Sequence, residues 1–386
     1  MADDTSTKTT KRLLSLDVFR GATIAGMMLV NNPGDWNQIY APWKHAAWDG
    51  WTFTDTIFPF FLWIVGVAMT LSFAKRVERG DNKGSLALHV LQRSAIIFVL
   101  GLVLSGFPFG LAFGHNYSFA TMRIPGVLQR IAVCYLVGGL IYLWSGFRVQ
   151  IAVTVGLLVV YWLAMAFIPV PEYGAGVLAP TGNLCWYIDS TLLRGHTWSG
   201  APAPGFDPEG IFSTLPAVAT VMFGVFTGHL LRSKLSDADK TVWMFVIGNL
   251  LVLTGLIMDN WLPINKNLWT SSYSVFMAGL ALNVFALCYW IIDVVGIKWW
   301  AKPFQINGLN AITVFFLAGL IGRLTSLIRF DMGEGTRVSL RRLYYDLLFV
   351  PIGDPMLASF IHAIAFMMGL YLIAYIMYKM NWIIKV

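Results

Sequence analysis

Two long apolar runs decide the fold of this chain: LLSLDVFRGATIAGMMLV at residues 13–30 and WTFTDTIFPFFLWIVGVAMTLSF at residues 51–73. Each approaches the ~20 residues that an α-helix needs to cross a bilayer. Between them lies Trp43-Lys44-His45-Ala46-Ala47-Trp48-Asp49-Gly50, which sets an imidazole among tryptophans. Tryptophan is enriched at membrane interfaces, and an imidazole can take, give or carry a proton near pH 7. His45 is therefore expected at the mouth of a membrane-embedded site.

Composition places the whole chain in the same class. Of its 386 residues, 57% are hydrophobic and 12% are charged, against roughly 25% charged in an ordinary soluble domain. The net charge of +7 comes from basic residues in short loops between apolar runs, which is a pattern of membrane topology and not of nucleic-acid binding. The expected surroundings are membrane lipid, with no nucleic-acid partner. Two of the three cysteines lie inside apolar runs, so no disulfide framework is predicted.

A hydropathy window of about 19 residues predicts an all-α polytopic membrane protein with about ten transmembrane helices. The expected ranges are 13–32, 52–74, 86–106, 123–145, 149–168, 211–231, 241–259, 271–292, 304–323 and 357–378. They form one transmembrane domain over residues 1–386. The longest non-apolar segment, 169–210, is rich in Gly, Pro and aromatic residues, and loops of this length are usually functional. We expect it to form an ordered external cap.

Positive charge predicts the orientation. Alternate connections on one side carry most of the lysines and arginines: Lys8, Lys11, Arg12, Lys75, Arg76, Arg79, Lys83, Arg148, Arg232, Lys234, Lys240, Lys298, Lys302, Lys379 and Lys385. That side is expected to be cytoplasmic, with both termini inside. A basic exception on the other side consists of Arg329, Arg337, Arg341 and Arg342. The polar N-terminus runs into a long first span without a small-residue cleavage site, which favours a retained helix.

Several stretches resemble one enzyme family. They are Ser15-Leu16-Asp17-Val18-Phe19-Arg20-Gly21, the block His45 to Gly50 with Asp55 and Phe58-Pro59, Arg123-Ile124-Pro125-Gly126-Val127-Leu128-Gln129-Arg130, Asp207-Pro208-Glu209-Gly210 and Ile264-Asn265-Lys266-Asn267-Leu268-Trp269-Thr270. In this order they resemble the heparan-alpha-glucosaminide N-acetyltransferase family. The resemblance implies a multi-span enzyme that takes acetyl from cytosolic acetyl-CoA and delivers it to the amino group of a glucosamine on the far side. It also implies a bacterial inner-membrane member, because the long luminal domain of the animal enzyme does not precede the first span.

The resemblance also implies catalytic residues. His45 falls on the family's catalytic histidine, and Asn31 falls on a family active-site asparagine. A histidine at this mouth can deprotonate the incoming ammonium, which is typically worth ~10²- to 10⁴-fold in rate, or can accept the acetyl group and pass it on. The sequence leaves both routes open. Asn31 can donate a hydrogen bond to the developing oxyanion, where one such donor is typically worth ~3–4 kcal/mol.

Substrate and cofactor contacts are assigned to six further residues. For the acceptor sugar they are Asp49, Glu209 as a partner of the ammonium, Lys266, and Trp269 stacking on a sugar face. For acetyl-CoA they are Arg130, as a phosphate contact, and Asn310, as a donor near the cytoplasmic end of the ninth helix. Each has a structural alternative: an interfacial belt for the tryptophans, capping for the acidic pair before the helix at 211, and framework contacts for Arg130. The remaining histidines share no metal-ligand spacing, so no metal is expected.

These observations predict an acetyl-CoA-dependent N-acetyltransferase for an amino sugar or an amino-sugar-terminated saccharide. The alternatives are a transporter or flippase for a saccharide or lipid-linked sugar, and an O-acyltransferase of surface glycans, since a histidine base activates a hydroxyl as well as an amine. The oligomeric state stays open between a monomer and a homodimer.

Overall fold

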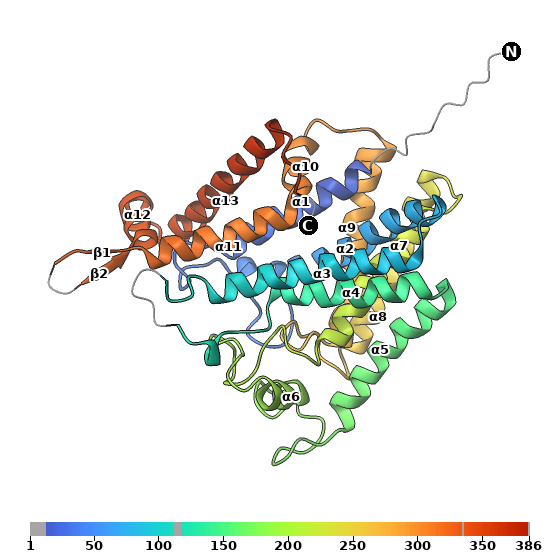
Figure 1. The fold of residues 1–386 in the computed structure, drawn as a ribbon, viewed down its shortest axis with the longest axis horizontal. Coiled ribbons are helices and arrows are strands. Elements are labelled where there is room, and N and C mark those ends of the chain that lie inside the picture. The colour runs from blue at the N-terminus through green and yellow to red at the C-terminus, as the bar shows by residue number, and fades with distance from the viewer. Residues whose placement is uncertain (1–12, 112–116, 334–335, 385–386) are drawn as a thin grey trace.

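The computed structural model describes residues 13–111, 117–333 and 336–384 as a helical protein with one small β-hairpin (Figure 1). The helices are α1 (Leu14–Val30), α2 (Phe53–Glu78), α3 (Lys83–Gly106), α4 (Val127–Trp144), α5 (Phe147–Phe167), α6 (Leu184–Leu192), α7 (Thr214–Leu231), α8 (Asp237–Met258), α9 (Ser271–Tyr289), α10 (Ala301–Leu309), α11 (Ala311–Leu327), α12 (Leu340–Leu348) and α13 (Pro355–Lys379). Strands β1 (Arg329–Asp331) and β2 (Arg337–Ser339) pair antiparallel between α11 and α12. Lys8, Lys11, Arg12 and Lys385, which entered the topology prediction, lie outside the described residues.

The predicted fold class, an all-α polytopic membrane protein, is confirmed. Eight of the described helices are long and apolar enough to cross a membrane, and α10 with α11 makes a ninth if that bent pair is one span. Helix α1, an expected span, has 17 residues and is not among the eight. Each expected range contains a helix, but the prediction of one continuous helix over 304–323 was wrong, because α10 and α11 meet at 79°.

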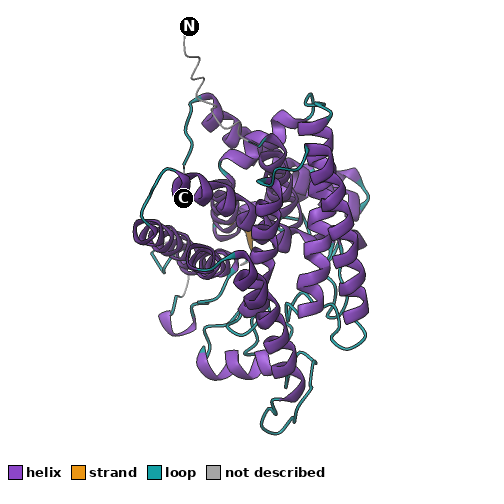
Figure 2. Ribbon diagram, turned by 90° about the vertical axis from the view of Figure 1, so that its right-hand side faces the viewer, coloured by secondary structure: helices purple, strands orange, loops and turns teal. Residues whose placement is uncertain are grey.

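Helices α2, α7 and α9 form the centre of the bundle. The apolar window of α2 is 72% buried and that of α7 is 61% buried, whereas the window of α8 is 22% buried. Backbones touch where α2 crosses α7, since a Cβ on Gly66 would lie 2.0 Å from the Val221 carbonyl oxygen. Figure 2, turned by 90°, shows helices making up most of the molecule. Peripheral helices leave apolar side chains exposed, as α8 does with Val242, Leu250 and Leu253.

The break between α10 and α11 occurs at Asn310, whose side chain is held by the C-terminal segment. Its amide nitrogen donates to the Trp382 carbonyl at 2.9 Å, and its Oδ1 accepts from the Ile384 N–H at 2.9 Å. Helix α10 also packs backbone to backbone on α1, because a Cβ on Gly21 would lie 1.7 Å from the Phe304 carbonyl oxygen. The bend therefore follows from tertiary contacts made by distant parts of the chain.

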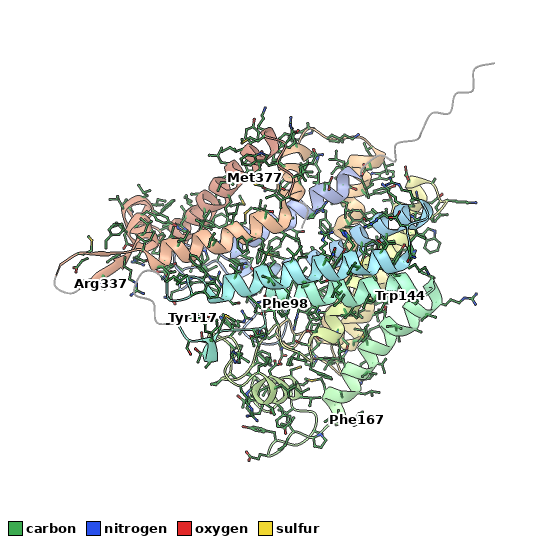
Figure 3. The ribbon with its side chains drawn as sticks, in the orientation of Figure 1. Phe98, Tyr117, Trp144, Phe167, Arg337 and Met377 are labelled. Atoms are coloured by element: carbon green, nitrogen blue, oxygen red, sulfur yellow. The ribbon has the colours of Figure 1, made fainter. Side chains whose placement is uncertain are left out.

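Segment 169–210, with α6, packs as a layer over one end of the bundle (Figure 1). Its interior contains Leu184, Cys185 and Phe206, which pack with Tyr161 of α5. Figure 3 labels Phe167 at the end of α5 that adjoins this layer and Trp144 at the end of α4 away from it. The layer is thus built on the end of the bundle that also carries the loop after α1.

Contacts group the connections at two ends, as the alternation of spans predicts. At one end, Trp48 donates from its indole nitrogen to the Leu178 carbonyl at 2.9 Å, and the Gly50 N–H donates to the Ile264 carbonyl at 2.7 Å. At the other end Arg232 pairs with Glu78. The loop with His45, segment 169–210 and the loop before α9 therefore share one end, and the basic loop after α2 lies at the opposite end.

Candidate active site

The His45 loop and the start of α2 are joined by a histidine–carboxylate pair. The His45 ring nitrogen Nδ1 lies 2.5 Å from Oδ1 of Asp55. The other carboxylate oxygen, Oδ2, accepts hydrogen bonds from the Ala46 N–H at 2.9 Å and from the Thr52 N–H at 3.0 Å. Thr52 caps α2 and Asp55 is its third residue, so the two form a capping box. The residue that caps the helix therefore also holds the imidazole.

This geometry favours one tautomer of the neutral ring. An ionised carboxylate only accepts hydrogen bonds, so Nδ1 carries the hydrogen and, in the neutral imidazole, Nε2 carries the lone pair. The Asp55 side chain is 1% exposed while that of His45 is 49% exposed. Within the described residues, Nδ1 is the ring nitrogen with a hydrogen-bond partner. Nε2 is thus free to accept a proton or to attack a carbonyl carbon.

The Asp55 backbone is also held by a hydrogen bond from α9. The Tyr273 hydroxyl on α9 donates to the Asp55 carbonyl at 2.6 Å, and Tyr273 is fully buried. Asp55 belongs to the stretch that resembles the family, and its contact with His45 was not predicted from the sequence. The spacing Thr52-x-x-Asp55 before an apolar run was the available signal, because it is the pattern of a capping box.

A second acidic group lies in the loop before α7. Arg123 donates to both oxygens of Asp207, at 2.8 and 2.6 Å, and to Glu209 Oε2 at 2.5 Å. Burial by itself raises the pKa of Glu209, but Arg123, Lys266 and Arg130 outweigh it and hold that pKa at about 2. Glu209 is therefore a carboxylate already committed to Arg123, which argues against its expected role as the free partner of an ammonium.

Two other residues of the predicted sugar site lie near the histidine. Asp49 is exposed and accepts from the Asn265 side chain at 3.1 Å. Lys266, the next residue, interacts electrostatically with both Asp55 and Glu209. The structure thus places His45, Asp49 and Lys266 at the same end of the bundle.

Arg130 and Trp269 are buried, contrary to the expected roles. Trp269 is 0% exposed and donates to the Thr220 hydroxyl at 3.2 Å. The guanidinium of Arg130 lies 5.2 Å above its ring and donates to the Gly210 carbonyl at 2.9 Å. A sugar cannot stack on Trp269 in this position, and a CoA phosphate has no open path to Arg130, which is 2% exposed. Both side chains instead bind α4, α7 and the loop before α9 to one another.

Asn310 is also occupied. It is 2% exposed, and both atoms of its amide group bond to the C-terminal backbone. This arrangement leaves it a framework residue at the helix break, so the expected contact with acetyl-CoA does not fit its position.

Asn31 lies at the edge of a cavity of about 600 Å³ between α1, α3, α4 and α11. It is the C-cap of α1 and is exposed, while Asn32 beside it is buried. The lining also includes three arginines that the sequence analysis did not place in a site, Arg123, Arg323 and Arg341. His45 is not part of this lining. Among the described residues, no group of three or more His, Cys, Asp or Glu side chains is arranged to hold a metal ion.

Comparison with known proteins supplies a family. Residues 12–264 match the family described as heparan-alpha-glucosaminide N-acetyltransferase, catalytic. The human (Homo sapiens) heparan-alpha-glucosaminide N-acetyltransferase is 30% identical over 357 residues, covering 79% of this chain and 52% of that protein. The mouse (Mus musculus) protein of the same name is 28% identical over 360 residues, covering 81% and 54%. The chain thus spans about half the length of the curated relatives it matches.

Proposed function

This chain belongs to the heparan-alpha-glucosaminide N-acetyltransferase catalytic family, and from that premise we propose that it transfers acetyl from acetyl-CoA to the amino group of a glucosamine-type sugar. The observation that carries the proposal is the His45–Asp55 pair, with Nδ1 held at 2.5 Å and Nε2 unoccupied at a half-exposed mouth. The catalytic residues are His45 and Asn31, and Asp55 is a positioning residue.

In the direct route, neutral His45 takes a proton from the sugar ammonium through Nε2. The amine nitrogen then attacks the thioester carbonyl carbon, the C–S bond breaks, and the protons end on imidazolium and the CoA thiol. In the covalent route, Nε2 itself attacks the thioester carbonyl carbon, the C–S bond breaks, and CoA leaves as a thiolate that takes one proton from the sugar ammonium. The free amine then attacks the acetyl carbon, the bond from that carbon to Nε2 breaks, and the imidazole takes the second proton from the nitrogen. Both routes need the same tautomer, the one that the contact between Nδ1 and Asp55 favours.

Asp49 is the carboxylate best placed to attract the ammonium, because it is exposed four residues from His45. Lys266 can orient sugar oxygens but not the ammonium, because like charges repel. Asn31 donates to the oxyanion that forms on the thioester carbonyl. We assign Asn31 this role because it is exposed, lines the 600 Å³ cavity and falls on the family's active-site asparagine.

Acetyl-CoA enters from the cytoplasm and the sugar from the opposite side of a bacterial inner membrane, with both termini cytoplasmic. Support comes from the basic loops, since Lys75, Arg76, Arg79 and Lys83 lie at the end of the bundle away from His45. The several charges of a CoA nucleotide cannot cross hydrocarbon cheaply, so only the acyl-pantetheine arm extends inward.

The test uses purified protein with radiolabelled acetyl-CoA and either glucosamine or glucose. We expect label on glucosamine as N-acetylglucosamine, little on glucose, and none on either with His45→Ala, which should still bind acetyl-CoA. A His45→Ala protein that turns over at the parental rate would refute the catalytic assignment. Equal labelling of glucose would indicate an O-acyltransferase. No transfer to either sugar would refute the proposed acetyltransferase activity.

A further inference from the structure

We propose that Arg323 and Arg341 form an anion-binding subsite that selects an acceptor sugar with a negatively charged substituent, beside the amino group that is acetylated. The inference rests on the proposed function and deepens it by naming the class of acceptor. Its starting point is the cavity of about 600 Å³ that Asn31 lines.

Arginines from three separate parts of the chain converge on this cavity. Arg123 precedes α4, Arg323 belongs to α11 and Arg341 to α12. Figure 1 shows α11, α12 and the end of α3 meeting on the same flank, and Figure 3 labels Tyr117, which also lines the cavity there. Among the described residues that line it, none is an aspartate or a glutamate.

The three arginines differ in how their charge is balanced. Arg123 is neutralised by Asp207 and Glu209. Arg323 donates only to the Gly319 carbonyl of its own helix, at 3.2 Å, and Arg341 donates to the Pro33 carbonyl at 2.5 Å. Over residues 13–111, 117–333 and 336–384, neither of these two has a carboxylate partner. The guanidinium groups of Arg323, which is exposed, and Arg341, which is partly exposed, are therefore available to an anion that enters the cavity.

A buried donor in the same wall supports this view. Gln129 is 4% exposed and lines the cavity, and its Nε2 has no hydrogen-bond partner among the described residues. A buried amide N–H that stays unpaired costs about 1–3 kcal/mol, so an acceptor atom is expected opposite it. The wall thus presents donors from Gln129, Arg323 and Arg341, which suit an oxyanion.

The chemistry of the guanidinium group limits the class of ligand that the subsite can bind. Its planar fork matches carboxylate, sulfate and phosphate oxygens bidentately. A neutral sugar would offer neither guanidinium an opposite charge. An amino sugar with an acidic substituent suits both groups of residues, because Asp49 attracts its ammonium and Arg323 and Arg341 attract its anion. The two groups are linked through Arg123, which lines the cavity and pairs with Glu209, and through Lys266, which interacts electrostatically with both Glu209 and Asp55.

The experiment compares glucosamine 6-phosphate with glucosamine as acceptors for wild type, Arg323→Gln and Arg341→Gln. The matched control is Arg342→Gln, the neighbouring arginine of α12, which pairs with Asp346 and does not line the cavity. Losing one charge-assisted hydrogen bond corresponds to roughly 10- to 100-fold. We therefore expect wild type to prefer the phosphorylated acceptor, and each cavity variant to lower the ratio of its kcat/KM to that of glucosamine about 10- to 100-fold. Arg342→Gln should keep the wild-type ratio.

Two further readouts separate the outcomes. Equilibrium binding of N-acetylglucosamine 6-phosphate, without acetyl-CoA, should weaken by a similar factor in both cavity variants. Weakened binding without any turnover would refute the acetyltransferase but support the subsite. Turnover with equal use of both acceptors would refute the subsite alone. A raised KM for acetyl-CoA with an unchanged acceptor ratio would assign the anion to CoA and overturn the proposal.

Discussion

Replacing Asp55 with asparagine separates the two tasks of this carboxylate. Oδ2 satisfies the Ala46 and Thr52 N–H groups, and Oδ1 accepts from the His45 ring. The asparagine oxygen can keep the two backbone hydrogen bonds, because it is an acceptor of the same reach. Its NH₂ group then faces Nδ1 as a donor. Nδ1 must become the acceptor, and the ring hydrogen moves to Nε2.

The wrong tautomer removes the group that accepts the proton. General-base catalysis is worth ~10²- to 10⁴-fold, and the corresponding substitution in the Ser-His-Asp triad lowers kcat about 10⁴-fold for this reason. We expect kcat for Asp55→Asn to fall within that range. The unfolding free energy should change little, since the capping box survives. Asp55→Ala should lose activity equally and also about 1 kcal/mol of stability, the typical value of a helix cap.

The assay follows release of the CoA thiol with a chromogenic disulfide, using glucosamine as the acceptor. Thermal unfolding in the same detergent gives the stability of each variant. Acetyl-CoA binding by calorimetry checks that the cofactor site is intact. Ala46→Gly is the matched control, because it changes the same loop while keeping the backbone N–H that Asp55 accepts from.

A kcat for Asp55→Asn within threefold of wild type, together with an inactive His45→Ala, would refute the role of Asp55 in setting the His45 tautomer. Asp55 would then only cap α2. A loss of activity that follows the loss of thermal stability across both variants would lead to the same conclusion.

Three further predictions concern topology, an ion pair and a buried aromatic. A cysteine at Asn37 should react with an impermeant thiol reagent on intact spheroplasts and one at Lys83 only after permeabilisation; the reverse pattern would overturn the orientation. Burial raises the pKa of Glu209 but Arg123 lowers it further, from 4.5 to about 2, so the pair stabilises the fold above pH 4.5 and the stabilisation is lost as the pH falls toward 2. Glu209→Gln should therefore have a lower Tm than wild type at pH 7, with the difference shrinking across that window; a constant difference would contradict the ion pair. Trp269→Ala should cost about 3–5 kcal/mol of unfolding free energy, measured by thermal or denaturant unfolding, and Trp269→Phe much less. A raised acceptor KM without lost stability would instead restore the sugar-stacking role.

The sequence predicted the helices well because hydropathy over a span-length window is a local property. Hydropathy did not predict the break at Asn310, because the residues that stabilise the bend lie on the C-terminal segment and on α1. A hydropathy window contains no information on the packing of Gly21 against Phe304, or on the hydrogen bond from Asn310 to the Trp382 carbonyl. Tertiary packing thus decides where one expected span becomes two helices.

The positions of side chains were predictable only where a motif carried them. The place of His45 between the first two spans followed from its apolar flanks, and its catalytic role stays a prediction. The burial of Trp269 was missed because its loop was taken as exposed. It is buried through the Thr220 hydrogen bond and the Arg130 contact, both made by helices far away in sequence. Arg341 was seen only as an exception to the charge rule. Arg341 in fact lines a cavity. A count of loop charges cannot distinguish an arginine that marks membrane topology from one that lines a cavity.

The packing of α1 on α10 has a consequence for biogenesis. Helix α1 leaves the ribosome before α2 to α13, yet the Ser15 N–H donates to Asp293, 278 positions later, and α10 follows that residue. Until those segments are synthesised, α1 lacks these contacts, and it carries Asp17 and Arg20 on a short helix. The free energy of inserting one charged side chain at the centre of a membrane helix is at least ~2.5–3.5 kcal/mol. These two residues bond to each other one turn apart, so they can offset part of that cost before any other helix arrives. Helix α1 is therefore expected to be the span most dependent on the insertion machinery, and to be retained there until the second half of the chain emerges.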